Sequence, residues 1–130
     1  MNKILLPILA AAALAGGLAA PGMASVAGTR AETVVTIKTE NGDFWGTVKS
    51  TRPLKCANER TVILFKQVGA EQDPSVDKRM ASDTASLSGD RYEWSTGNTG
   101  LRRGKFYAKV ARTPECRPDT SPTVRASSTT

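Results

Sequence analysis

The sequence contains no histidine, and this absence narrows the chemistry that the chain can perform. Histidine is the commonest general base in enzymes and belongs to most triads that activate a serine or cysteine nucleophile. It is also a frequent zinc ligand, and the two cysteines of the chain are too few to complete a tetrahedral zinc shell. We therefore expect no catalytic residues, no metal site and no cofactor.

The acidic residues follow no spacing that is typical of a site. Four of them stand at or beside predicted turns: Asp43, Asp83, Asp90 and Glu93. Aspartate at a turn commonly accepts hydrogen bonds from the neighbouring backbone, which gives these residues a structural role. None of them fits the ligand spacing of a calcium-binding loop. A carboxylate pair for acid–base catalysis stays a distant alternative.

A long hydrophobic run occurs only at the amino terminus. Residues 1–3 carry one lysine, residues 4–18 form an uncharged apolar run, and small residues follow. This layout is typical of a secretory signal peptide, and the apolar run is short for a membrane span. We expect residues 1–27 to be a signal peptide that is cleaved after Ala27, with Ala24 as the next candidate. An uncleaved anchor is the alternative.

Export gives a meaning to the basic charge of the chain. The formal net charge is +6, and removal of the signal with Lys3 leaves +5. A basic exported protein meets anionic polymers of a cell envelope, and its charge could hold it there weakly. A merely soluble surface is the simpler interpretation. We expect a secreted or cell-envelope protein with no stable membrane span after cleavage and no nucleic acid as a partner.

The two cysteines, Cys56 and Cys116, allow one intramolecular pairing. An even number of cysteines in an exported chain indicates a disulfide. The bridge would close a loop of about 60 residues, which contributes roughly 4 kcal/mol in the chain-entropy model. We therefore predict a Cys56–Cys116 disulfide.

Beyond residue 28 the chain shows the two-residue alternation of strands and no sustained helical period. The predicted strands are 33–39, 44–50, 60–68, 78–83, 91–94, 105–112 and 121–125, and the predicted loops include 52–59, 69–77 and 95–104. The pair Asn41-Gly42 predicts a tight hairpin between the first two strands. We expect an all-β, antiparallel, Ig-like or transthyretin-like sandwich of about seven short strands over residues 28–125, with a disordered tail over 126–130.

Five short motifs occur in a characteristic order along this predicted sandwich. They are Gly46-Thr47-Val48, Arg60 to Phe65, Ser82-Asp83, Gly89 with Tyr92 and Trp94, and Gly104 to Val110. Their order resembles the carboxypeptidase regulatory-like, transthyretin-like (prealbumin-like) β-sandwich domain, and the two cysteines resemble those of a secreted bacterial version. The spacing between Ser82-Asp83 and Gly89 is wider than in typical members. The resemblance covers residues 33–125 and implies an accessory or structural role, without catalytic residues.

The stretch 102–116 combines cations with two neighbouring aromatic residues. Alternation places Phe106, Ala108 and Val110 on an inner face and Lys105, Tyr107 and Lys109 on an outer face, after Arg102 and Arg103 in the preceding loop. Such an outer face could stack sugars or bases and attract phosphates. The alternative is an ordinary solvated strand face.

Trp45 is the other candidate for a binding surface, because alternation places it opposite the inner residues Phe44 and Val48. An outward tryptophan is typical of a carbohydrate platform or an interface anchor, unless loops cover it. We predict a non-enzymatic exported domain that binds or scaffolds anionic envelope polymers, glycans or another exported protein. The alternative is a carbohydrate-binding module. It would use aromatic residues from the set Trp45, Tyr92, Trp94 and Tyr107.

Overall fold

The computed structural model describes residues 29–127, which form strands and one short helix. The signal peptide predicted over 1–27 and the last residues of the predicted tail, 128–130, lie outside the described residues. The elements are β1 (Thr33–Val35), β2 (Lys38–Glu40), β3 (Asp43–Ser50), α2 (Pro53–Cys56), β4 (Thr61–Gln67), β5 (Lys78–Thr84), β6 (Ser86–Ser88), β7 (Arg91–Asn98), β8 (Gly104–Val110), β9 (Asp119–Thr120) and β10 (Val124–Ala126). No helix in this part of the chain is long and apolar enough to cross a membrane.

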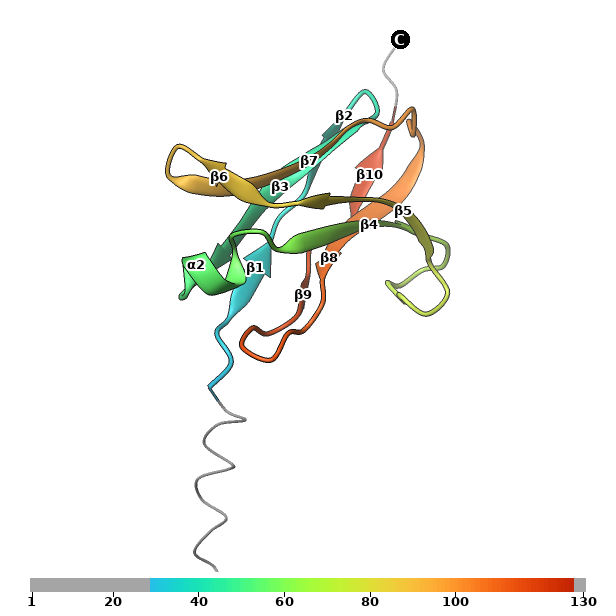
Figure 1. The fold of residues 1–130 in the computed structure, drawn as a ribbon. Coiled ribbons are helices and arrows are strands. Elements are labelled where there is room, and N and C mark those ends of the chain that lie inside the picture. Colours follow the sequence, from blue (N-terminus) through green and yellow to red (C-terminus); the bar gives the residue numbers. More distant parts are fainter. Residues whose placement is uncertain (1–28, 128–130) are drawn as a thin grey trace, which may run out of the picture.

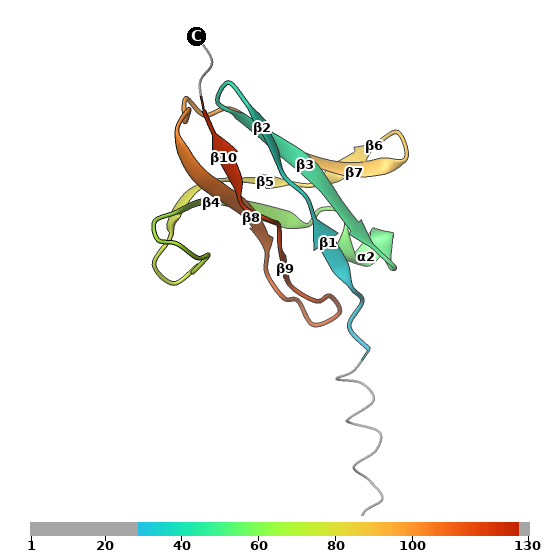
Figure 2. The same cartoon turned by 180° about the vertical axis from the view of Figure 1, so that it is seen from behind.

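Two antiparallel sheets make up the fold, and they pack face to face (Figure 1). The first sheet has the order β1-β3-β7-β6, with β2 also paired to β3. The second has the order β10-β8-β4-β5, with β9 also paired to β8. Seen from behind in Figure 2, β1 lies toward one end of the sandwich and β10 toward the other. The predicted all-β, antiparallel sandwich with one disulfide is confirmed.

The core lies between the sheets and consists of the residues that alternation assigned to the inner faces. Phe44 and Val48 of β3 are buried, as are Phe106 and Val110 of β8. The rings of Phe44 and Phe106 meet across the two sheets with their centroids 4.7 Å apart. The hairpin at Asn41-Gly42 is also confirmed, because Glu40 pairs with Asp43 and both turn residues have positive φ.

Hydrogen bonds between the sheets hold both edges of the sandwich. At one edge, the backbone N–H of Val35 in β1 donates to the Asp119 carboxylate in β9 at 2.8 Å. At the other edge, the N–H of Ser95 in β7 donates to the Asp83 carboxylate in β5 at 2.7 Å. Between β5 and β6 the chain passes from one sheet to the other through the fully buried Ala85. These links fix the position of one sheet relative to the other.

Several predicted boundaries are wrong. The predicted strand 33–39 is divided into β1 and β2, and the predicted loop 52–59 contains α2. Strand β7 continues to Asn98 through much of the predicted loop 95–104. Thr96 forms a bulge there, because Phe44 pairs with Gly97 while Trp45 pairs with Ser95. The predicted tail begins inside β10, which ends at Ala126.

Candidate binding surface

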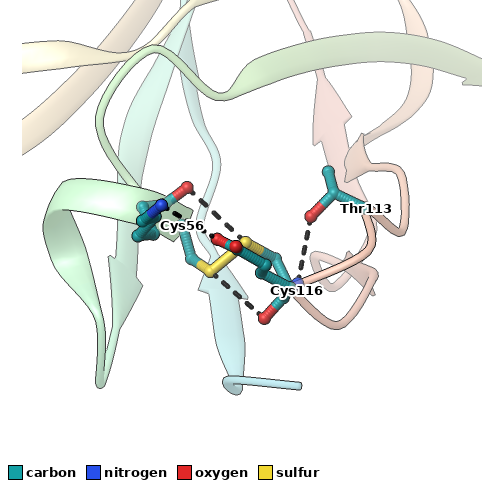
Figure 3. A network of polar contacts seen from close by, with 5 residues as sticks. Cys56, Thr113 and Cys116 are labelled. Atoms are coloured by element: carbon teal, nitrogen blue, oxygen red, sulfur yellow. Dashed lines mark hydrogen bonds and ion pairs between the residues drawn. A yellow bond between two sulfur atoms is a disulfide. The ribbon is translucent and has the colours of Figure 1, made fainter. Parts of the chain in front are cut away.

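The predicted disulfide between Cys56 and Cys116 is present, with the two Cα atoms 5.5 Å apart (Figure 3). Both cysteines are buried, and no free thiol occurs among residues 29–127. The bridge joins the end of α2 to the loop after β8, where the Cys116 N–H donates to Thr113 Oγ1 at 3.0 Å. Cys116 is therefore a structural residue and not a reactive group.

The same loop holds the beginning of the described chain. The Ala31 N–H donates to the Glu115 carbonyl at 2.9 Å, and the Arg117 N–H donates to the Ala31 carbonyl at 2.8 Å. Ala31 and Cys116 thus form a parallel bridge beside the disulfide. The bridge and the first described residues form one connected unit.

Arg60 is a buried arginine whose role the sequence pattern did not reveal. Only 5% of the residue is exposed, and burial lowers the pKa of its guanidinium. The guanidinium donates to four oxygens at 2.7–3.1 Å: Thr33 Oγ1 and the carbonyls of Cys56, Ala111 and Arg117. These acceptors come from separate segments around the disulfide. Arg60 therefore holds the end of the sandwich together and does not face a ligand.

Tyr107 is fully buried, so its predicted place on an exposed face is wrong. Its ring stacks on Phe65 of β4 with the centroids 5.4 Å apart, and its O–H donates to the Asp77 carboxylate at 2.6 Å. The same carboxylate accepts backbone N–H groups of Val68 at 2.9 Å and Asp73 at 2.7 Å. The loop between β4 and β5 is thereby fastened over this face of β8. The alternation of residue types along β8 does not reveal that this loop covers the strand.

The contacts of Asp77 and Tyr107 shift both pKa values in the directions that favour the bonded pair. Burial raises the pKa of the Tyr107 hydroxyl, and the bond to the Asp77 carboxylate raises it further. Burial alone would raise the pKa of Asp77, but the hydrogen bonds from Tyr107, Val68 and Asp73, with the charge of Lys105, lower it overall. The pair is a structural lock between a loop and a strand.

The four predicted cations of this region do not gather around an exposed aromatic residue. Arg102 and Arg103 are exposed in the loop before β8, while Lys105 and Lys109 are half-buried on the strand. Lys105 Nζ donates to the Gly69 carbonyl at 2.7 Å, so this lysine helps to hold the loop between β4 and β5. The structure therefore leaves a set of separate surface charges without a ring to stack a ligand.

Trp45 lies on the outer face of the first sheet, as alternation predicted, and it is half-buried. It stands on β3 with Lys38 of β2 directly opposite on one side and Ser95 of β7 on the other. A hollow of about 360 Å³ adjoins Trp45. This hollow is lined by Thr36, Lys38, Trp45, Gly46, Thr47, Lys49, Arg91 and Glu93.

The outer face around this hollow, formed by Lys38, Trp45, Thr47, Lys49, Arg91 and Glu93, is called the Trp45 surface below. It carries three cations and one acid. Within residues 29–127 neither lysine makes an ion pair, and Arg91 only approaches its exposed neighbour Asp90 at 3.9 Å. The cations are therefore available to an anionic ligand beside an aromatic ring.

A second hollow, of about 470 Å³, lies on the side of Trp45 toward β6. It is lined by Trp45, Gly46, Asp83, Ser86, Ser88, Glu93, Trp94 and Ser95. The strand register places part of this set side by side, because Ser86 of β6 pairs with Glu93 of β7, and Glu93 pairs with Thr47 of β3. One tryptophan thus borders two hollows of different composition.

The other aromatic candidates are less suitable as binding platforms. Trp94 is 1% exposed, and its indole N–H donates to the Thr36 carbonyl at 3.0 Å. Tyr92 is half-buried and packs against the core. Trp94 and Tyr107 are therefore structural residues, and Trp45 remains the aromatic centre of the surface.

The sequence comparisons do not assign the chain to a family. No family model matches the chain, and no curated protein is significantly similar to it. The resemblance to the carboxypeptidase regulatory-like domain therefore stays a prediction. Among residues 29–127 no cluster of three or more histidine, cysteine, aspartate or glutamate residues could hold a metal ion.

Proposed function

We propose that the mature chain is an exported, non-enzymatic domain that attaches to a polymer of the bacterial cell envelope or its surroundings through the Trp45 surface. The observation that carries this proposal is the placement of Trp45 beside a hollow with three cations, Lys38, Lys49 and Arg91, on one sheet face. An aromatic ring supplies contact area at little entropic cost, and exposed cations attract an anionic polymer.

The architecture supports a binding role because the surface is rigid. Trp45 and Lys49 belong to β3, which pairs with β1 and β2 on one side and, from Asp43 to Val48, with β7 on the other. The backbone that carries these side chains is already ordered, so a ligand does not have to order it on binding. The sandwich therefore acts as a scaffold for the surface.

Export is supported by two independent features of the chain. The first is the signal-like pattern of residues 1–27. The second is the disulfide, since such bonds persist mainly in oxidising compartments. A role without catalysis is supported by the absence of histidine from the sequence and by the structural use of Asp77, Tyr107 and both cysteines.

Sedimentation with insoluble cell-envelope polymer tests this proposal. The exported protein is compared with two triple variants that remove equal charge: Lys38→Gln/Lys49→Gln/Arg91→Gln on the Trp45 surface, and Arg102→Gln/Arg103→Gln/Lys109→Gln elsewhere. We expect the first variant and Trp45→Ala to lose at least about tenfold in affinity. The second variant should bind nearly as well as the natural protein. Equal losses in both triple variants, or unchanged binding by Trp45→Ala, would overturn the assignment of the surface.

A further inference from the structure

The two hollows beside Trp45 differ in chemistry. The hollow toward β1 and β2 contains all three cations of the Trp45 surface. The hollow toward β6 contains no cation and is lined by serine hydroxyls and by the carboxylates of Asp83 and Glu93, of which Glu93 also lines the first hollow. Trp45 belongs to both linings. The surface therefore has a cationic side and a hydroxyl–carboxylate side that meet at one aromatic ring.

From this division we infer that the ligand is an acidic glycan, a polysaccharide whose sugar rings carry carboxylate groups. This inference rests on the proposed function and names the ligand class of the same surface. A sugar ring packs on the face of Trp45, and its carboxylate lies among Lys38, Lys49 and Arg91. The hydroxyls of the adjoining sugar bond to the serine and carboxylate side chains of the other hollow.

The free polar groups of the second hollow favour a sugar over a ligand that offers charge alone. The side chains of Ser86, Ser88 and Glu93 are exposed and make no hydrogen bond within residues 29–127. Carboxylate oxygens accept hydrogen bonds from sugar hydroxyls, whereas they repel phosphate or carboxylate groups. A uniformly anionic chain would therefore be attracted to one hollow and repelled from the other.

The same repulsion sets the orientation of the glycan. Glu93 borders both hollows, but Asp83 lines only the hollow toward β6, where no cation offsets the two carboxylates. An acid group therefore belongs on the side of Lys38 and Lys49. From β2 to β6 the sheet crosses three inter-strand spacings, which is about 15 Å at the usual strand separation. The surface is therefore long enough for a short oligosaccharide that runs across the strands.

Isothermal titration of the disulfide-bonded exported protein tests this inference. The probes are oligomers of galacturonate, mannuronate and glucuronate, each beside its uncharged methyl ester, together with polyphosphate and poly-aspartate. We expect at least one acidic oligomer to bind at least about tenfold more tightly than its ester, because one hydrogen-bonded charge pair supplies that difference. Polyphosphate and poly-aspartate should bind more weakly.

Substitutions test which side chains produce the preference for the acidic oligomer over its ester. Lys38→Gln/Lys49→Gln/Arg91→Gln should reduce binding of the acidic oligomer to the level of its ester, and Trp45→Ala should remove binding of both. Arg102→Gln/Arg103→Gln/Lys109→Gln serves as the control of equal charge and should keep the preference. If polymer attachment depends on Trp45 but no acidic oligomer binds, or the esters bind as well, the ligand class is wrong and the proposed function stands. If polyphosphate binds as tightly, charge alone decides and the inference fails.

Discussion

The indole N–H of Trp94 donates to the carbonyl oxygen of Thr36 at 3.0 Å, and the pair leaves no space beside Gly46. In a regular ladder that carbonyl would accept the N–H of Thr47. Here the Thr47 N–H donates instead to Thr36 Oγ1 at 2.8 Å, and the two threonine hydroxyls lie 2.9 Å apart. The exchange of partners interrupts the strand between β1 and β2 while every group keeps a hydrogen bond. The bond from Trp94 also links Thr36, in the segment between β1 and β2, to the core.

Replacement of Gly46 by alanine should destabilise the fold by about 3 kcal/mol or more, since overpacking of a rigid site forces the backbone to move. A Cβ at this position would clash with the carbonyl oxygen of Thr36 and would lie 2.8 Å from Trp94 Nε1. Gly69→Ala is the matched control, because a Cβ there meets nothing within 4 Å. Urea unfolding measures both. A Gly46→Ala variant as stable as Gly69→Ala would contradict the close approach.

Replacement by phenylalanine should strongly destabilise the fold at Trp94 and change its stability little at Trp45. Trp94→Phe leaves the Thr36 carbonyl without its donor and opens a gap in the core, which should cost about 2–4 kcal/mol. Trp45→Phe should change the free energy of unfolding by less than about 1 kcal/mol, as expected for a half-buried site. The fluorescence that remains in Trp45→Phe comes from the buried Trp94 and should resist quenching by acrylamide. Strong quenching in that variant would show that the assignment of the two rings is wrong.

Much of the fold could be predicted because its signals are local. Alternation identified the inner residues of β3 and β8, and Asn41-Gly42 identified the hairpin. The division at Thr36 could not be predicted, since it depends on Trp94, which is 58 positions away in the chain. Tyr107 was misplaced for a similar reason. Its cover is a loop fastened through Asp77, 30 positions away, and alternation carries no information about such a contact.

The candidate site was predictable only at its centre. Trp45 and Lys49 follow from alternation within β3, but their companions Lys38 and Arg91 come from β2 and β7. They meet through cross-strand register, which the sequence pattern alone does not give. The exposed ring predicted for the basic stretch is absent, because local cation density says nothing about which neighbouring aromatic residue stays exposed.

Replacement of Arg60 by methionine should be among the most destabilising single changes in the chain. The variant keeps the volume but removes the donors of four oxygens around the disulfide. A buried acceptor that loses its donor costs about 1–3 kcal/mol, so the loss of several such bonds at once is strongly destabilising. Arg103→Met, at an exposed position, should stay within about 0.5 kcal/mol of the natural protein. Equal stability of the two variants in urea unfolding would show that Arg60 does not hold this end together.

The disulfide predicts a specific mass for the exported protein. After denaturation and treatment with an alkylating reagent, the intact mass should match an unmodified chain that begins near Gly28, and both cysteines should react only after reduction. Alkylation without reductant, or a retained signal, would contradict the oxidised exported domain. The double variant Cys56→Ala/Cys116→Ala should lose roughly 4 kcal/mol, because the closed loop no longer restricts the unfolded chain. Hydrogen exchange at the Ala31 and Arg117 amides should rise in that variant, since their mutual bridge borders the disulfide.

The Asp77–Tyr107 bond predicts a loss of stability at both ends of the pH range. The pKa of Asp77 is lowered in the folded state, so its contribution is present above the ordinary value of 3.8 and is lost as the pH falls below it. The pKa of Tyr107 is raised, so its contribution is complete below the ordinary value of 10.0 and is lost as the pH rises above it.

Two variants separate these limbs of the pH profile. Tyr107→Phe should cost about 1.5–3 kcal/mol near neutral pH, because a hydrogen bond to a charged group is lost, and should flatten the alkaline limb. Asp77→Asn should flatten the acidic limb, since no carboxylate remains to be protonated there. Thermal unfolding from acidic to strongly alkaline pH measures both. If Tyr107→Phe loses stability above the ordinary tyrosine pKa as steeply as the natural protein, another group controls the alkaline limb and the lock assigned to this pair is wrong.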